Sequence, residues 1–256
     1  MNKQNTVFEY DELALFFRKP YKINDKISIR QPTIGEIVEM GEARYFNTAH
    51  IFTATPSDMM VQLEDLGIRY EDVSEYELFC TLVKNLPYEE SKIFFEGIDF
   101  SKFQWGTVTE NDGERMIFYS PEQGIVIDFS IVMKIQDYLR FLHGFKKNEI
   151  FAATNTTRRL LIEDERMKQE MRKRKKEKSS LLPLISSLVN MPGFKYNSSQ
   201  LEQIGIYEFF DSVSRITAIH SSTALLNGCY SGNIDMKKLK KDALTVYLKV
   251  DVSELE

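Results

Sequence analysis

Histidine is the side chain best suited to acid–base or metal chemistry near neutral pH, and this sequence has three: His50, His143 and His220. Each lies inside or at the end of a segment whose apolar spacing predicts a helix. None has a second metal-ligating residue three or four positions away. We therefore interpret all three as structural, and their spacing predicts no zinc site.

Carboxylates recur at every third position in Glu36, Glu39 and Glu42, which could direct them to one helix face and toward a divalent cation. No histidine accompanies them, so a solvated helix face is the better interpretation. The 12 glycines fall singly, and neither GxGxxG nor GxxxxGK[ST] occurs. The residues therefore predict no metal, no cofactor, no small-molecule substrate and no enzymatic activity.

A run of basic residues is the strongest functional candidate. It belongs to one long charged helix predicted for residues 154–179, TNTTRRLLIEDERMKQEMRKRKKEKS. Beyond its first turns this helix has almost no apolar face, so it must project into solvent, bridge two parts of the molecule or lie on a partner. The predicted partner-binding residues are Arg166, Lys168, Arg172, Lys173, Arg174, Lys175, Lys176 and Lys178.

Two classes of partner fit this basic run. Lys and Arg along a helix can follow a nucleic-acid backbone, but the run has no interleaved aromatic residues for base stacking. The chain is also acidic, with a net charge of -5 and a pI near 5.5. An acidic protein surface is therefore the favoured partner, and nucleic acid is the alternative.

Charge is divided unevenly along the chain. Residues 1–150 carry 16 Lys and Arg against 25 Asp and Glu, a net charge of -9, whereas residues 151–256 carry 17 against 13, a net charge of +4. The two parts could attract each other, and self-association is a further option.

The two cysteines and the N-terminus indicate the compartment. Cys80 and Cys229 lie far apart and have no metal-ligand spacing, so we expect reduced, buried thiols. The first residues contain no apolar signal-peptide core, and the chain has no apolar run of about 18 residues. We therefore expect no membrane span and a cytosolic protein.

The first 150 residues predict an N-terminal helical domain with a small hairpin and a three-stranded meander. Capping boxes at Thr33–Glu36 and Ser74–Glu77 introduce helices, and Asp128 caps another that ends at Gly144. The predicted helices are 10–17, 34–52, 56–66, 75–86 and 129–143, the hairpin spans 21–30, and the strands are 102–109, 114–119 and 125–128.

Residues 151–180 are expected to form the charged connector helix, and residues 181–256 a C-terminal helical domain. Within that domain we predict a helix over 181–190, a start signal at Ser199–Glu202, and a helix over 206–227 that Gly228 terminates. The predicted fold is α+β and mostly α-helical, with a small antiparallel β-meander and one long charged projecting helix.

Several segments carry a resemblance to a known family. They are ISIRQPTIGEIVEMGE at residues 27–42, TATPSDMMVQLEDLGIRYEDVSEYELF at 53–79, FKYNSSQLEQIGIYEFFDSVSRI at 194–216 and YSGNIDMKKL at 230–239. Together with the basic helix, their order resembles the tail assembly chaperones, or tail morphogenesis proteins, of tailed bacteriophages and prophages of low-GC Gram-positive bacteria.

The resemblance implies a non-enzymatic protein in the cytoplasm of the infected or lysogenic bacterial host. It would keep the tape measure protein soluble, or bind the tail tube protein, while the tube polymerises. A structural component retained in the virion tail is a close alternative. An enzyme with a site between the two halves is less supported, because no acid and base occur together at short spacing.

Overall fold

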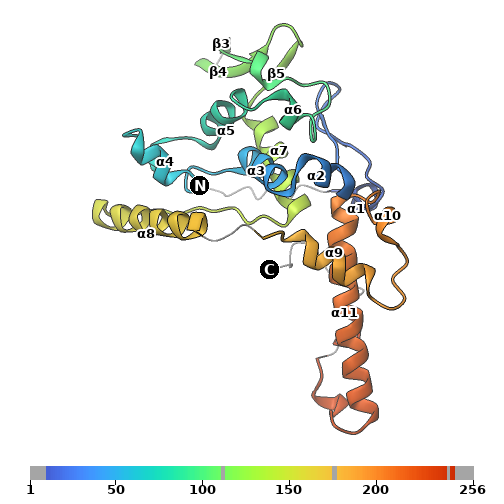
Figure 1. Cartoon of the computed structure of the whole chain (residues 1–256). Helices are drawn as coiled ribbons and strands as arrows, with labels where there is room; N and C mark the ends of the chain where they lie inside the picture. Colours follow the sequence, from blue (N-terminus) through green and yellow to red (C-terminus); the bar gives the residue numbers. More distant parts are fainter. Residues whose placement is uncertain (1–9, 111–112, 175–177, 241–242, 246–256) are drawn as a thin grey trace.

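The computed structural model describes residues 10–110, 113–174, 178–240 and 243–245 (Figure 1). The fold is α+β and mostly helical, as the sequence predicts. The helices are α1 (Glu12–Phe16), α2 (Ile34–Met40), α3 (Glu42–Thr53), α4 (Met60–Asp65), α5 (Glu75–Lys84), α6 (Tyr88–Ser91), α7 (Phe129–His143), α8 (Asn155–Arg174), α9 (Leu181–Val189), α10 (Ser198–Leu201) and α11 (Ile206–Tyr230), with single 3-10 turns η1 (Tyr70–Asp72), η2 (Phe100–Lys102) and η3 (Met236–Lys238).

Two antiparallel sheets accompany the helices. β1 (Tyr21–Lys22) pairs with β2 (Ser28–Ile29) as the predicted small hairpin. β3 (Gln104–Glu110), β4 (Gly113–Ser120) and β5 (Ile125–Ile127) form the predicted meander, with β4 in the centre. Glycine at position 106 leaves room for the Tyr119 ring on β4, because a Cβ there would lie 2.4 Å from a ring carbon and would require the ring to shift.

Local start and stop signals explain most helix boundaries. Thr33 and Glu36 form a complete capping box at α2, and Ser74 and Glu77 form one at α5. Asp128 accepts a hydrogen bond from the backbone of α7, which ends at Gly144 in the left-handed conformation. These predictions are confirmed.

The single helix predicted over 34–52 is wrong, because α2 and α3 are separated at Gly41. Its φ of 91° lies far from helical values and is accessible at low cost only to glycine. The helix predicted from Pro56 also begins later. Thr55 and Asp58 instead exchange hydrogen bonds between side chain and backbone in a turn, and α4 starts at Met60.

Two further signals near the C-terminus are also corrected. The side chain that caps α10 is Asn197, paired with Gln200, and not the predicted Ser199 with Glu202. Gly228 does not end α11, which continues to Tyr230. Glycine lowers helix stability but does not forbid helix, and Ile234 packs where a Cβ of Gly228 would lie.

One hydrophobic core extends across the boundary predicted near residue 150. It contains Phe52, Phe79 and Tyr138 from the first part of the chain together with Leu188 and Phe209 from the last. The predicted division into 1–150, 151–180 and 181–256 therefore does not correspond to separate hydrophobic cores.

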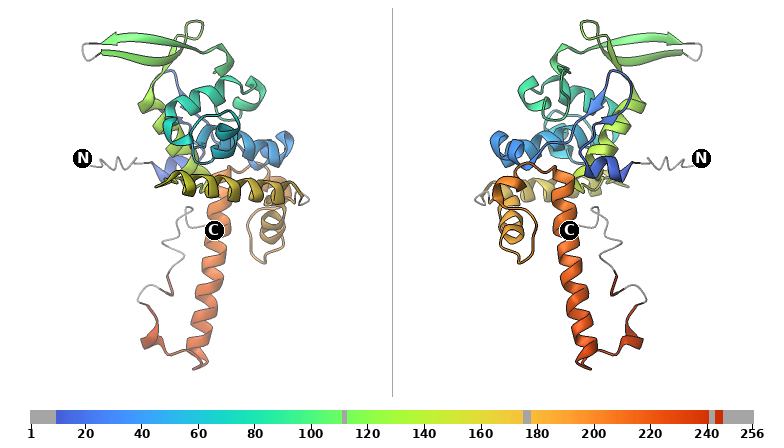
Figure 2. Two further views of the ribbon diagram at one scale, coloured as in Figure 1. Left: turned by 90° about the vertical axis from the view of Figure 1, so that its left-hand side faces the viewer. Right: turned by 90° about the vertical axis from the view of Figure 1, so that its right-hand side faces the viewer.

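Hydrogen bonds tie the start of α11 into the N-terminal body. Thr33 and Gly205 form an isolated antiparallel bridge. Beside it, the buried Gln31 side chain donates to the carbonyl of Leu15 and accepts from the backbone N–H of Tyr207. The distal part of α11 leaves this body and extends away from it, as the two views of Figure 2 show.

Candidate partner-binding site

The charged helix α8 lies on the molecule's own surface along its first half. Ile162 is 4% exposed and packs with Met60, Val61 and Leu63 of α4 and with Tyr70. This small cluster is separate from the main core. The apolar residues in the first turns of the predicted helix therefore dock it against α4, which lies beside α8 in Figure 1.

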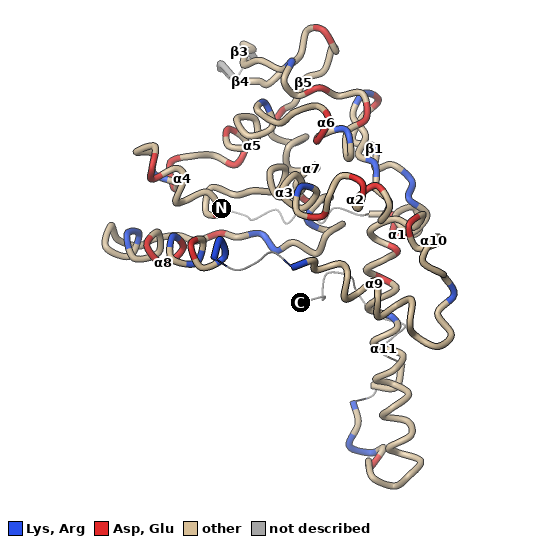
Figure 3. Tube along the Cα trace, viewed as in Figure 1, with Lys and Arg blue, Asp and Glu red and all other residues tan. Residues whose placement is uncertain are grey.

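Ion pairs flank this apolar contact. Arg158 Nη1 lies 3.5 Å from Glu64 Oε2, and Arg166 Nη2 lies 2.6 Å from Asp65 Oδ1. The hydrogen bond from Arg166 lowers the pKa of Asp65, although both side chains are solvent-exposed. Figure 3 shows charges of both signs along α8 and acidic residues at the end of α4. Such exposed pairs orient a helix but add little stability, particularly at high salt.

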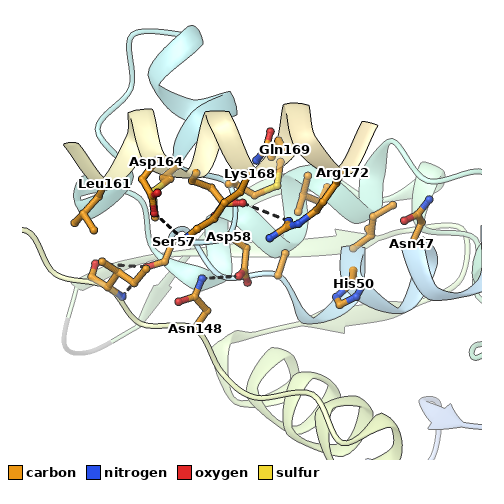
Figure 4. A pocket seen from close by; sticks show the side chains of 17 residues that line it. Asn47, His50, Ser57, Asp58, Asn148, Leu161, Asp164, Lys168, Gln169 and Arg172 are labelled. Carbon is orange, nitrogen blue, oxygen red and sulfur yellow. Dashed lines mark hydrogen bonds and ion pairs between the residues drawn. The ribbon is translucent and has the colours of Figure 1, made fainter. Parts of the chain in front are cut away.

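A cleft of about 580 Å³ opens between α8, α4, α3 and the segment before α8 (Figure 4). Its volume falls within the range of about 300–1,000 Å³ common for binding sites. The apolar lining residues are Ile51, Ala54, Met59, Met60, Leu82, Ile150 and Leu161. The polar lining residues are Asn47, His50, Ser57, Asp58, Asn148, Asp164, Glu165, Lys168, Gln169 and Arg172.

Charged side chains on the α8 wall of the cleft pair with each other. Lys168 Nζ lies 2.7 Å from Asp164 Oδ2, and Arg172 Nη1 lies 3.4 Å from Glu165 Oε1. A partner that brings both a carboxylate and a cation could exchange with either pair, so that the displaced Asp164 or Glu165 is paired again. The wall can therefore exchange its own ion pairs for pairs with a bound protein.

A hydrogen bond and a ring stack hold together the segments that line the cleft. Asn148 donates to Asp58 Oδ1 over 2.8 Å, which ties the segment before α8 to the turn before α4. The His50 ring stacks on Phe145 with 4.3 Å between centroids, and burial lowers the pKa of His50. These contacts favour a pre-formed binding surface.

The structure places six of the eight predicted partner-binding residues. Lys168 and Arg172 line the cleft, Arg166 pairs with α4, and Arg174 pairs with Glu170 one turn earlier. Within the described residues, Lys173 and Lys178 are exposed and form no ion pair. Lys175 and Lys176 lie outside the described residues. The set is therefore split between the cleft wall, the exposed end of α8, and Lys178 in the segment after it. The helix predicted over 154–179 is wrong at its C-terminal end, because α8 ends at Arg174 and residues 178–179 are not helical.

Glu42 has a role that the spacing of the acidic residues did not indicate. Its carboxylate accepts hydrogen bonds from the backbone N–H groups of Ser180 and Leu181 and from the hydroxyls of Ser179 and Ser180. It therefore caps α9 from 138 residues away. Burial alone would raise the pKa of Glu42, but these hydrogen bonds lower it.

The other two members of the acidic trio do not join Glu42 in a site. Glu36 completes the α2 capping box and pairs with Arg30, whereas Glu39 is exposed. Among the residues that the structure describes, no three His, Cys, Asp or Glu side chains gather closely enough to hold a metal ion. We find the trio distributed over separate local interactions.

The remaining candidate residues occupy three different environments. His143 is buried, donates from Nδ1 to the carbonyl of Leu139, and accepts at Nε2 from the Tyr45 hydroxyl, which is 2.6 Å away. Burial lowers the pKa of His143 to about 4. His220 is exposed on α11. Cys80 is buried as expected, whereas Cys229 is only half-buried, and both are free.

Comparisons with known proteins add no relative from which a site could be transferred. No protein-family model, no curated protein and no solved structure matches this chain. In the part of the chain that the structure describes, no helix has the length and apolar character needed to span a membrane.

Proposed function

We propose that this chain is a non-enzymatic phage tail morphogenesis protein, a chaperone that binds the tape measure protein in the cytoplasm of the bacterial host during tail assembly. One observation carries the proposal: the cleft beneath α8 combines an apolar floor with a wall of exchangeable ion pairs. The order of sequence segments described above supplies the class of partner.

A tape measure protein is a long helical client whose apolar stripe would aggregate if it were left exposed. A helix of this kind is recognised by a groove that accepts its apolar residues and by polar groups at the groove edge. Met59 and Met60 suit such a floor, because methionine side chains adapt to differently shaped partners.

The exposed end of α8 adds an electrostatic component to the proposed interaction. Lys173 at this end and Lys178 in the segment after α8 form no ion pair with the described residues, so both can attract an acidic client surface at a distance. Attraction between exposed charges increases the association rate and weakens as salt is added. We therefore expect client binding to be faster at low salt.

The test is association of the purified chain with the tape measure and tail tube proteins encoded by the same phage. Replacing Arg172, Lys173, Arg174, Lys175 and Lys176 by Gln should weaken association, with the larger effect at low salt. A matched control replaces the exposed Lys237, Lys238 and Lys240 by Gln. Equal binding by the wild type and the five-residue variant would assign α8 a spacer role.

Localisation in particles separates the chaperone from a structural component of the tail. Mass spectrometry of co-purified proteins and of finished particles from one culture should find the chain with its client and not in the virion. Its presence in the virion would establish the structural alternative. Recovery of neither phage protein would reject the proposed function.

Ion pairing along α8 makes a nucleic-acid partner less favoured. Arg166, Lys168, Arg172 and Arg174 each have an acidic neighbour that competes with phosphate. Electrophoretic mobility shifts on single-stranded and duplex DNA at two salt concentrations test this alternative. A salt-sensitive shift that the five Gln substitutions remove would support nucleic-acid binding.

A further inference from the structure

A second groove, of about 450 Å³, lies beside α11 on the C-terminal part of the molecule. Its apolar walls are formed by Phe16 of α1, Met191 and Phe194 of the segment after α9, and Ile216 and Ile219 of α11. The α11 lining extends from residue 211 to residue 220, which corresponds to about 13 Å along the helix. The groove therefore accommodates about two turns of another helix.

Two exposed apolar side chains lie on the helix that forms one wall of this groove. Leu13 of α1 and Phe17, its C-cap residue, are 68% and 64% exposed. They are four residues apart, so they point outward one turn, or about 6 Å, apart. Phe16, between them in sequence, contributes to the groove instead. This short segment thus contributes one side chain to the groove wall and presents two others outward.

Charges beside these two features have opposite signs. Asp11 and Glu12 are exposed at the N-terminal end of α1. At the groove edge, Lys195 and Arg215 have side chains that are 61% and 43% exposed. Both carboxylate oxygens of the buried Asp211 accept from the single Nε–H of Arg215, and this bifurcated hydrogen bond holds the guanidinium at the edge.

We propose that this face binds a second copy of the chain, with α1 of each protomer seated in the α11 groove of its partner. A two-fold interface uses the same patch on both subunits, so the patch must contain complementary parts. Here the segment around α1 supplies the protruding apolar side chains and the acidic residues. The groove accepts those side chains, and its edge supplies the basic residues. The inference is independent of the proposed client.

The test measures oligomeric state by sedimentation from about 1 to 100 µM, which brackets the affinities of weak specific dimers. We expect a reversible dimer. Leu13→Glu should raise the dissociation constant of the dimer about 100-fold. Each buried Leu13 contributes a factor of about ten, and the two-fold dimer contains two of them. Leu66→Glu is the matched control, since Leu66, the C-cap residue of α4, is 73% exposed and lies outside the groove.

Charge reversal provides a second measurement that does not depend on apolar contacts. Glu12→Lys and Lys195→Glu should each weaken the dimer at low salt, because each homodimer then opposes like charges. An equimolar mixture of the two variants should dimerise again as a heterodimer, since one Glu–Lys pair across the interface is then native and the other is restored in reverse. Circular dichroism of each variant checks that the helices are retained.

Three results would each overturn the proposal. They are a wild-type chain that stays monomeric over the whole concentration range, Leu13→Glu and Leu66→Glu variants that dimerise equally, and a mixture that associates no better than its components. A groove that instead serves the tape measure client would give a monomer whose client binding is lost in Leu13→Glu. That outcome would leave the chaperone proposal standing and reject self-association.

Discussion

Ile162→Ala is the most direct test of how α8 is attached to the rest of the molecule. Ile162 is the only residue of α8 that is buried among those the structure describes, and it packs in the small cluster on α4. Isoleucine to alanine in a core costs about 2–5 kcal/mol. We take the lower end, about 2 kcal/mol, because this cluster is small and lies at the surface, where it can collapse around the truncated side chain.

A loss of about 2 kcal/mol raises the population of undocked α8 about 30-fold. Hydrogen exchange monitored by mass spectrometry should show faster exchange in residues 155–174, while α7 in the main core keeps its protection. The matched control is Leu160→Ala, because Leu160 is 62% exposed on the same helix. Unchanged exchange in α8, or equal loss of protection in α7, would refute the docking described for Ile162.

Three further substitutions test individual hydrogen bonds. Glu42→Gln should cost about 1 kcal/mol at neutral pH. Because the folded pKa of Glu42 is lowered, its stabilisation is present above the unfolded value of 4.5 and is lost as pH falls through the folded pKa, so urea unfolding of wild type and variant should converge in acid. His143 has a folded pKa of about 4 against 6.5 unfolded, so its contribution to the free energy of unfolding is present above pH 6.5 and is lost as pH falls toward 4. Between pH 7 and 4.5, the free energy of unfolding of the wild type should fall by on the order of 2–3 kcal/mol more than that of His143→Gln. Gln31→Leu should cost about 2 kcal/mol in urea unfolding, because it removes two buried hydrogen bonds, one to the Leu15 carbonyl and one from the Tyr207 N–H. A loss below about 0.5 kcal/mol would contradict this role.

Predictions based on neighbouring residues succeeded where the determining contacts are themselves local. The capping boxes at Thr33 and Ser74 are closed by residues only three positions away. The meander follows from alternating apolar residues and turn signals, which place its three strands and their order. A single sequence contains the whole of this information.

Glycine was the main source of error in the predicted helix boundaries. Gly41 and Gly228 both occur within apolar helical patterns, yet one separates two helices and the other lies inside α11. The difference is the backbone conformation, since Gly41 has a positive φ and Gly228 keeps helical geometry while Ile234 packs against it. That distinction depends on tertiary packing.

The candidate site was predictable only in part, because its members come from distant segments. The basic residues of α8 could be identified from composition alone. Their partners could not, since Asp65 meets Arg166 across 101 residues and Glu42 meets Ser180 across 138. The cleft itself depends on Leu161 and Ile162 docking on α4, and no local pattern specifies that surface.

Anchoring on both sides of α8 has a consequence for any affinity measured at the cleft. Before α8, Thr55 donates to the carbonyl of Asn148, and after it Ser180 and Leu181 bind Glu42. An undocked α8 therefore stays close to α4, at an effective concentration that short tethers commonly place in the millimolar range. A helix that binds α4 from solution competes with this tethered segment at every moment. Cutting the chain after α8 would leave it tethered only through the segment before it, which lowers this effective concentration and weakens the wall that α8 gives the cleft.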